Sequence, residues 1–177
     1  MGLLDTLLGN QAQQQEYQDF ADRYQQGAPH EGYSDQEVSQ RYQQVAPHLS
    51  QQEYEQSAEQ SFSRLSPLER TQFGQRLQQH AKEQNYTGPG VGQNVDADQS
   101  QDPRYLAQMT GQIHQQQPGL LEGLLGGGSG AGLLGSPVAR AALAGIAATA
   151  VSRALGGGMG GGLAGGALGG LLGQQRG

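Results

Sequence analysis

The sequence predicts an all-α fold, a small bundle of about four short helices followed by a helical, Gly-rich low-complexity tail. The first observation behind this prediction is an internal repeat, since residues 34–81 divide into three sixteen-residue units. The second is the spacing of apolar residues in these units, three and four positions apart, which is typical of amphipathic helices. The third is a split composition: all Phe and Tyr residues lie between Tyr17 and Tyr105, whereas most of the Gly lies beyond them.

Each sixteen-residue unit opens with a helix start signal, a Ser followed three residues later by a Glu. In this pattern, the capping box, the Ser hydroxyl accepts a hydrogen bond from an early helical N–H, and the Glu carboxylate accepts one from the Ser N–H. The sequence therefore predicts a new helix every sixteen residues. The three pairs are Ser34 with Glu37, Ser50 with Glu53, and Ser66 with Glu69.

A further amphipathic helix is predicted before the repeats, ending at Gly27 ahead of Pro29. Because aromatic side chains bury large apolar areas, we expect the core to lie in the first half of the chain. The residues expected to be buried are Tyr17, Phe20, Ala21 and Tyr24 in this helix, Val38, Tyr42 and Val45 in the first unit, Tyr54, Ala58, Phe62 and Leu65 in the second, and Leu68, Phe73, Leu77 and Ala81 in the third.

Charge is distributed unevenly along the chain. The formal net charge is −6, with a net charge of −8 over residues 1–105 and of +2 over the remainder. A protein that binds nucleic acid needs a clustered basic face, so we expect no nucleic-acid partner. The chain has no Cys, which excludes disulfides and thiolate chemistry. The first residues lack the basic and apolar regions of a secretory signal peptide, so we expect a cytoplasmic protein.

Two similar Leu-rich turns occur far apart, GLLDTLLG at residues 2–9 and GLLEGLLG at residues 119–126. Their Leu residues share one helix face, yet a helix this short is not stable alone in water. We therefore expect them to dock on the folded head, on each other or on lipid; a frayed terminus and a linker are the alternative. The docking residues are Leu3, Leu4, Leu7, Leu8, Leu120, Leu121, Leu124 and Leu125.

Two more helices are predicted in the second half. One starts at Asp102-Pro103 and places Leu106, Met109 and Ile113 on one face. The other starts at Ser136-Pro137, is rich in Ala, a strong helix former, and ends at Gly156. Only twelve uncharged residues separate Arg140 from Arg153 in this helix, too few to span a bilayer.

The C-terminal glycines recur every four residues. In a helix they would form one smooth face, and small residues at this spacing allow close helix packing in membranes. Residues 154–173 are uncharged and about as long as a membrane span, but eleven of the twenty are Gly, which weakens a helix in water. A flexible tail is therefore the alternative to a glycine zipper. The zipper residues are Gly157, Gly161, Gly165, Gly169 and Gly173.

These patterns divide the chain into five parts. They are a Leu-rich amphipathic N-terminus (1–12), a helical module with the three units (13–86), a linker (87–101), a short helix with a Leu/Gly linker (102–135), and an Ala-rich helix with the glycine-zipper tail (136–177).

Motifs that carry chemistry are not evident in the sequence. The four His residues are far apart, and no helix presents two of them at the i, i+4 spacing that suits a metal. The Gly runs follow no strand and lack the Lys-Ser/Thr of a phosphate loop. We therefore assign no catalytic, cofactor-binding or metal-binding residue, and we expect no enzyme and no small-molecule substrate.

The opening MGLLDTLLG resembles the start of the YidB-like family of small bacterial proteins, which begin with a Leu/Gly-rich helix. The likeness covers roughly the first ten residues and not the sixteen-residue units. It implies a bacterial source and a cytoplasmic, mainly helical protein, and it carries no catalytic residue over.

The patterns together favour a non-enzymatic interaction or scaffold protein, with an acidic helical head and a glycine-zipper tail. Its expected partners are further copies of itself, as a homo-oligomer, or a membrane, so that it is cytoplasmic and peripheral to or anchored in the inner membrane. Two alternatives stay open: a hydrophilic protective protein of the stress or desiccation type, and an enzyme with an unrecognised site.

Overall fold

The computed structural model describes residues 11–27, 32–88, 97–121 and 136–157. Within these ranges 85% of the residues are helical and none is in a strand, which confirms the all-α prediction. The helices are α2 (Gln11–Gln26), α3 (Asp35–Val45), the 3₁₀ turn η1 (Ala46–His48), α4 (Gln51–Ser63), α5 (Pro67–Glu83), α6 (Ala97–Gln101), α7 (Pro103–Gln116) and α9 (Pro137–Gly157).

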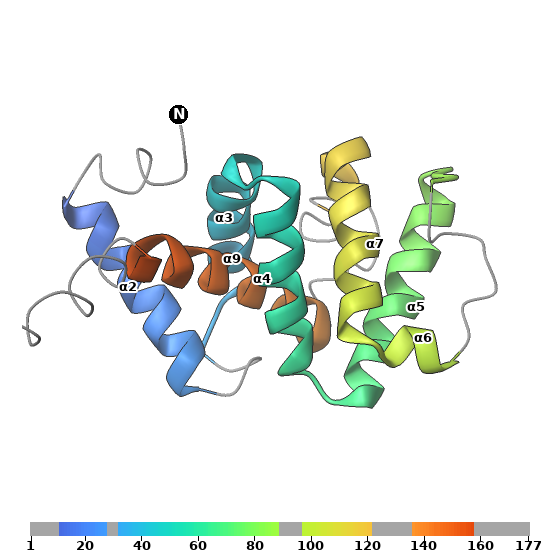
Figure 1. The fold of residues 1–177 in the computed structure, drawn as a ribbon, viewed down its shortest axis with the longest axis horizontal. Helices are drawn as coiled ribbons and strands as arrows, with labels where there is room; N and C mark the ends of the chain where they lie inside the picture. Colours follow the sequence, from blue (N-terminus) through green and yellow to red (C-terminus); the bar gives the residue numbers. More distant parts are fainter. Residues whose placement is uncertain (1–10, 28–31, 89–96, 122–135, 158–177) are drawn as a thin grey trace, which may run out of the picture.

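The helices are arranged around α4 and α9. Helices α3, α4, α7 and α5 stand side by side, and α9 runs across them behind α3 and α4, towards α2 (Figure 1). Helix α4 packs against α7 on one side and against α9 on another, while α2 and α3 also rest on α9. The last of the described helices is therefore at the centre of the fold.

The predicted Ser caps form at the predicted positions. The hydroxyls of Ser50 and Ser66 each accept a hydrogen bond from the N–H of the Glu three residues later, at 3.3 Å in both cases. The carboxylates of Glu53 and Glu69 accept hydrogen bonds from the Ser N–H groups in return, so both capping boxes are complete. These caps fix where α4 and α5 begin.

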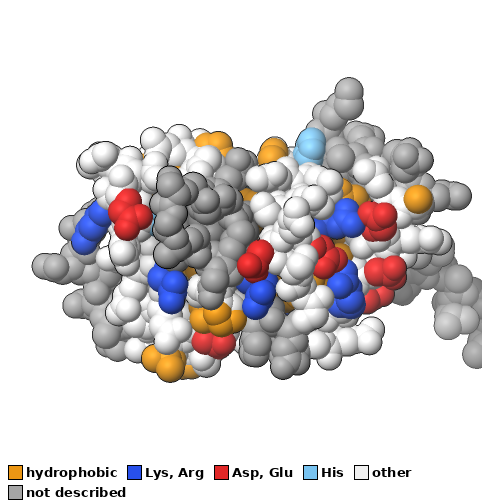
Figure 2. Space-filling model, turned by 180° about the vertical axis from the view of Figure 1, so that it is seen from behind, with side chains coloured by type: hydrophobic (Ala, Val, Ile, Leu, Met, Phe, Trp, Pro, Cys, Tyr) orange, Lys and Arg blue, Asp and Glu red, His pale blue; other side chains and the backbone are white. Residues whose placement is uncertain are grey.

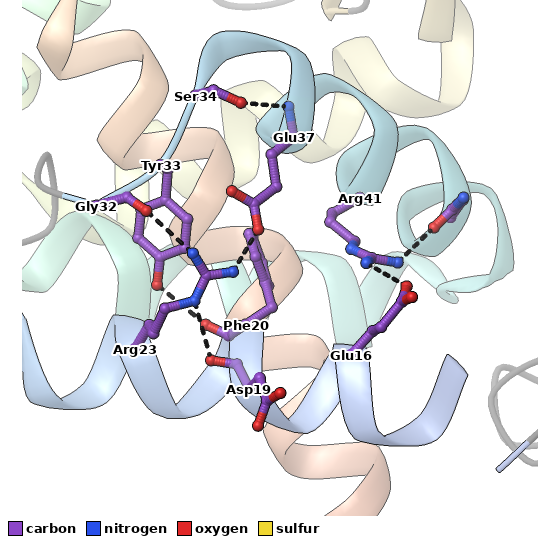
Figure 3. Close-up of polar contacts among 10 residues, drawn as sticks. Glu16, Asp19, Phe20, Arg23, Gly32, Tyr33, Ser34, Glu37 and Arg41 are labelled. Atoms are coloured by element: carbon purple, nitrogen blue, oxygen red, sulfur yellow. Dashed lines mark hydrogen bonds and ion pairs between the residues drawn. The ribbon is translucent and has the colours of Figure 1, made fainter. Parts of the chain in front are cut away.

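The first cap differs from the other two because its Glu has another partner. The Ser34 hydroxyl accepts a hydrogen bond from the Glu37 N–H at 3.1 Å, as predicted. The Glu37 carboxylate, however, pairs with the Arg23 guanidinium of α2 and so joins α2 to α3 (Figure 3). Arg23 also donates to the Gly32 carbonyl at 3.0 Å, which holds the connection between these helices. A charged partner from another helix has replaced the local half of the capping box.

Most of the residues predicted to be buried do form the core. Aromatic contacts join the helices: Phe62 of α4 lies 5.0 Å from Phe73 of α5, ring centre to ring centre, and the hydroxyls of Tyr42 and Tyr54 lie 2.8 Å apart. The predicted residues that are buried are Tyr17, Phe20, Ala21, Tyr24, Val38, Tyr42, Val45, Tyr54, Ala58, Phe62, Leu65, Phe73, Leu77 and Ala81, together with Leu106, Met109 and Ile113 of α7.

The prediction for Leu68 is wrong, since its side chain is 68% exposed. Leu68 lies in the first turn of α5, five residues before Phe73. Five residues correspond to about 500° of helical rotation, which places Leu68 roughly 140° away from the buried face.

The expectation that the core lies in the first half of the chain is also corrected. Every residue from Ala141 to Ala150 of α9 is buried, and the apolar side chains among them share one cluster with the aromatic residues of α2, α3 and α4. The aromatic side chains do form the core, but they need an apolar surface to pack on. The small side chains of α9 supply that surface and let several helices approach it closely.

The segment expected to be a linker contains a short helix. Helix α6 covers Ala97–Gln101, packs against α5, and leads directly into α7. Asp102 caps α7 as predicted, because its side chain accepts a hydrogen bond from the Arg104 N–H at 2.9 Å. Pro103 then occupies the first turn, where a missing N–H has no cost.

Candidate interaction region

Helix α9 is apolar on all its sides over most of its length. A helix of this kind is either enclosed by other helices or surrounded by lipid. The twelve uncharged residues between Arg140 and Arg153 predicted no membrane span, but by length and composition Pro137–Leu155 is the one stretch among the described helices that could cross a membrane. Its apolar window is nevertheless 72% buried inside the protein. A helix at the centre of a helical core meets the same criterion, and the packing of α2, α3 and α4 on α9 explains its composition.

Small residues bring α4 and α9 into close contact. The Ser61 hydroxyl of α4 donates a hydrogen bond to the Ala142 carbonyl of α9 at 2.8 Å, and both groups are buried. Gly145, one turn further along α9, faces the same hydroxyl and the hydroxyl of Tyr24, and there is no room between them for a Cβ atom. Gly145 is therefore a close contact between helices at a small residue, within the core and not in the tail.

A polar pocket of about 390 Å³ lies where α2, α4 and the last turns of α9 meet. The pocket is near the point at which the glycine repeat begins, because α9 ends at Gly157. Its lining residues are Tyr24 and Gln25 of α2, Gln60 of α4, Arg64 at the C-cap of α4, and Thr149, Ser152 and Arg153 of α9.

Both arginines of this pocket are held by neutral groups. Arg64 donates to the carbonyl of Tyr24 at 2.7 Å and to that of Gly27 at 3.4 Å, and its guanidinium lies 4.4 Å from the centre of the Tyr24 ring. Arg153 donates to the side-chain oxygen of Gln56 at 2.6 Å. Burial raises the pKa of Tyr24, so this hydroxyl stays neutral beside Ser61 at physiological pH.

Exposed apolar side chains are few among the described residues. On the face shown in Figure 2, Lys and Arg residues lie close to Asp and Glu residues, and apolar side chains occur as separate spots. Among the described large apolar residues, Leu68 is the exposed one. The described side chains on this face therefore form no broad apolar patch for a partner.

The predicted interaction residues lie partly within the described chain. Leu120 and Leu121 are 4% and 0% exposed and belong to the core cluster, so these two residues dock on the head, which is one of the three places expected for them. Gly157 is the last residue of α9. The other predicted residues lie outside the described ranges, namely Leu3, Leu4, Leu7, Leu8, Leu124, Leu125, Gly161, Gly165, Gly169 and Gly173.

The pocket was missed in the sequence because its residues come from three distant segments. One signal was available for α9: its apolar residues cover the whole helix circumference, which predicts enclosure or lipid. No comparable signal marks Arg64 or Arg153 as neighbours. In the described ranges, no three His, Asp or Glu residues lie close enough to hold a metal ion.

Comparisons with known proteins leave the family open. No protein family model matches the chain, and no match was found among the curated proteins or among the solved structures. The resemblance of the first ten residues to the YidB-like family stays a prediction. The fold defines the class, an all-α protein whose aromatic helices enclose an Ala-rich helix.

Proposed function

We propose that this chain is a non-enzymatic interaction protein, in which the acidic helical head carries a C-terminal glycine repeat that associates with further copies of itself. The observation that supports this proposal is the position of α9. The helix is buried in the head and ends at Gly157, where the four-residue glycine register begins. The repeat therefore starts from a fixed point on a folded domain.

The glycine repeat has the spacing that close helix association uses, since small residues at every fourth position let two backbones approach. The contact of Gly145 with Ser61 illustrates the same principle within the head. A purely hydrophilic protective protein has less support, because such chains lack enough apolar surface for an enclosed core. The many aromatic residues buried around α9 form a core of that kind.

The position of α9 determines how the proposal has to be tested. Removing residues 136–177 would remove the centre of the core and unfold the head, so loss of association would have no clear meaning. Removing residues 158–177 spares α9. We expect the full chain to sediment as an oligomer, and the chain truncated after Gly157 to sediment as a monomer with an unchanged thermal melt.

A matched pair of substitutions then tests the glycine face. Gly165→Leu should weaken oligomerisation because a large side chain blocks close approach, whereas Gly165→Ala should preserve it, since Ala is also small. Sedimentation velocity and liposome flotation are measured on both variants. A monomeric full chain, or equal association of both variants with the parent, would refute the proposal. Stronger flotation of Gly165→Leu would instead identify the tail as a simple hydrophobic membrane anchor.

A further inference from the structure

The pocket between α2, α4 and α9 has an unusual charge for this protein. Two of its seven lining residues are arginines, Arg64 and Arg153, and the other five are neutral and polar. No carboxylate lines it, although the chain as a whole has a net charge of −6. An acidic protein thus gathers two cationic groups in one concave site.

Four other arginines in the described ranges are neutralised by carboxylates, whereas Arg70 donates to the backbone carbonyls of Phe62 and Leu65. Arg23, Arg41, Arg104 and Arg140 each form an ion pair with an Asp or Glu. The hydrogen bonds of Arg64 and Arg153 go to backbone carbonyls and to an amide oxygen, which carry no net charge. Their positive charges are therefore available to an anion from solution.

The pocket also holds its donors in place before any ligand arrives. The three contacts of Arg64 orient its guanidinium, and one hydrogen bond to Gln56 holds that of Arg153. A guanidinium has five N–H donors in a rigid fork, so these contacts leave donors over on both residues. Gln25 donates to the Ser152 hydroxyl oxygen at 3.0 Å, which leaves the hydroxyl proton of Ser152 for a ligand.

Arg64 also has a structural role, whereas Arg153 does not, so a substitution of Arg153 tests the pocket without disturbing the fold. Arg64 binds two carbonyls at the C-terminal end of α2, which stabilises that helix end. Arg153 is exposed and donates to the side chain of Gln56, so it does not stabilise a helix end as Arg64 does.

We propose that this pocket binds a phosphate group, carried by a small free phosphate compound or by the headgroup of a lipid. A phosphate monoester has a charge near −2 at neutral pH and three acceptor oxygens. Two arginines match this charge, and the hydroxyl and amide groups of Ser152, Thr149 and Gln60 surround the remaining space. A volume of about 390 Å³ lies within the range of small-ligand sites.

Binding of inorganic phosphate to the full chain is measured by calorimetric titration at constant ionic strength. The test variant is Arg153→Gln, and the matched control is Arg76→Gln, which changes the net charge equally at an exposed position outside the pocket. We expect saturable binding that Arg153→Gln weakens by about ten- to a hundredfold, as for loss of a hydrogen bond between charged groups. Arg76→Gln should leave the affinity unchanged.

The two sources of the phosphate are distinguished with vesicles of phosphatidylcholine, with and without phosphatidic acid. Flotation that requires phosphatidic acid, and that Arg153→Gln but not Arg76→Gln reduces, would identify a lipid headgroup. Binding of inorganic phosphate without such flotation would identify a free phosphate compound. The proposal is overturned if neither ligand binds, or if both variants lose the same affinity, because the effect would then be one of net charge alone. Thermal melts of each variant show whether the head is intact.

Discussion

Gly145 of α9 lies directly against the Ser61 hydroxyl of α4, with no room for a side chain between the two helices. Ser61 uses this closeness to donate its hydrogen bond to the Ala142 carbonyl. The same site is closed on its other side by the Tyr24 hydroxyl of α2. Three helices from distant parts of the sequence thus meet at one glycine.

Replacing Gly145 by Ala should therefore destabilise the head by about 1–3 kcal/mol, as overpacking of a core does. Gly74→Ala is the control. Gly74 is also buried within a helix, but a Cβ there would lie 3.4 Å from Leu106, an ordinary contact. Higher helix propensity should make this variant neutral or more stable by up to about 1 kcal/mol. Urea unfolding of both variants compares them, and equal free energies would contradict the packing of α9 on α4.

The two complete capping boxes predict a loss of stability when either Ser is removed. Ser50→Ala and Ser66→Ala should each cost about 1 kcal/mol, because an N–H at the helix start loses its acceptor. Thermal melts of the full chain are the measurement, since a fragment without α9 would lack part of the core. Ser63→Ala removes an exposed hydroxyl that donates to the Glu59 carbonyl within α4, and this control should be nearly silent.

The aromatic core predicts a larger effect at Phe62, which is 0% exposed and packs against Phe73. Phe62→Ala should cost about 3 kcal/mol or more, a large fraction of the stability of a domain of this size. Gln60→Ala, on the exposed side of α4, should have little effect on stability. Equal melting temperatures for the two variants would show that the helix phase assigned to α4 is wrong.

Acid should weaken the cap of α4 through Glu53. The hydrogen bonds from the Ser50 hydroxyl and N–H lower the pKa of Glu53, so this group contributes stability above its unfolded pKa of about 4.3. The contribution is lost as the pH falls through the lowered, folded-state pKa. The Glu53→Gln variant lacks the ionised carboxylate and therefore its stabilising contribution. The difference in unfolding free energy between parent and variant should be larger at pH 7 than at pH 3.

A double substitution checks the cause of this pH dependence. In a Ser50→Ala background the hydroxyl partner of Glu53 is absent, so the effect of Glu53→Gln should depend less on pH. Urea unfolding at pH 7 and pH 3 measures all four chains. An unchanged pH dependence in the Ser50→Ala background would assign it to the hydrogen bond from the N–H of residue 50, which Ala retains.

Local signals were enough to predict most of the helices from the sequence. Helix starts depend on neighbouring residues, and Ser50, Ser66 and Asp102 cap their helices with side chains only two or three positions away from the bonded N–H. The inward faces of α2, α3, α4 and α7 follow from apolar spacing, because a helix turns by about 100° at each residue. The same local reasoning wrongly predicted that Leu68 is buried. Leu68 comes five residues before Phe73, so it lies on the exposed side of α5.

Only the tertiary structure showed that the other helices enclose α9. An Ala-rich helix with no polar face has the composition of a core helix and of a membrane helix, so its own residues do not distinguish the two. The choice depends on Tyr24, Ser61 and other side chains far away in the sequence, which pack on α9 and leave no space at Gly145. The pocket of Arg64 and Arg153 arises in the same way, because it exists only where the ends of three separate helices converge.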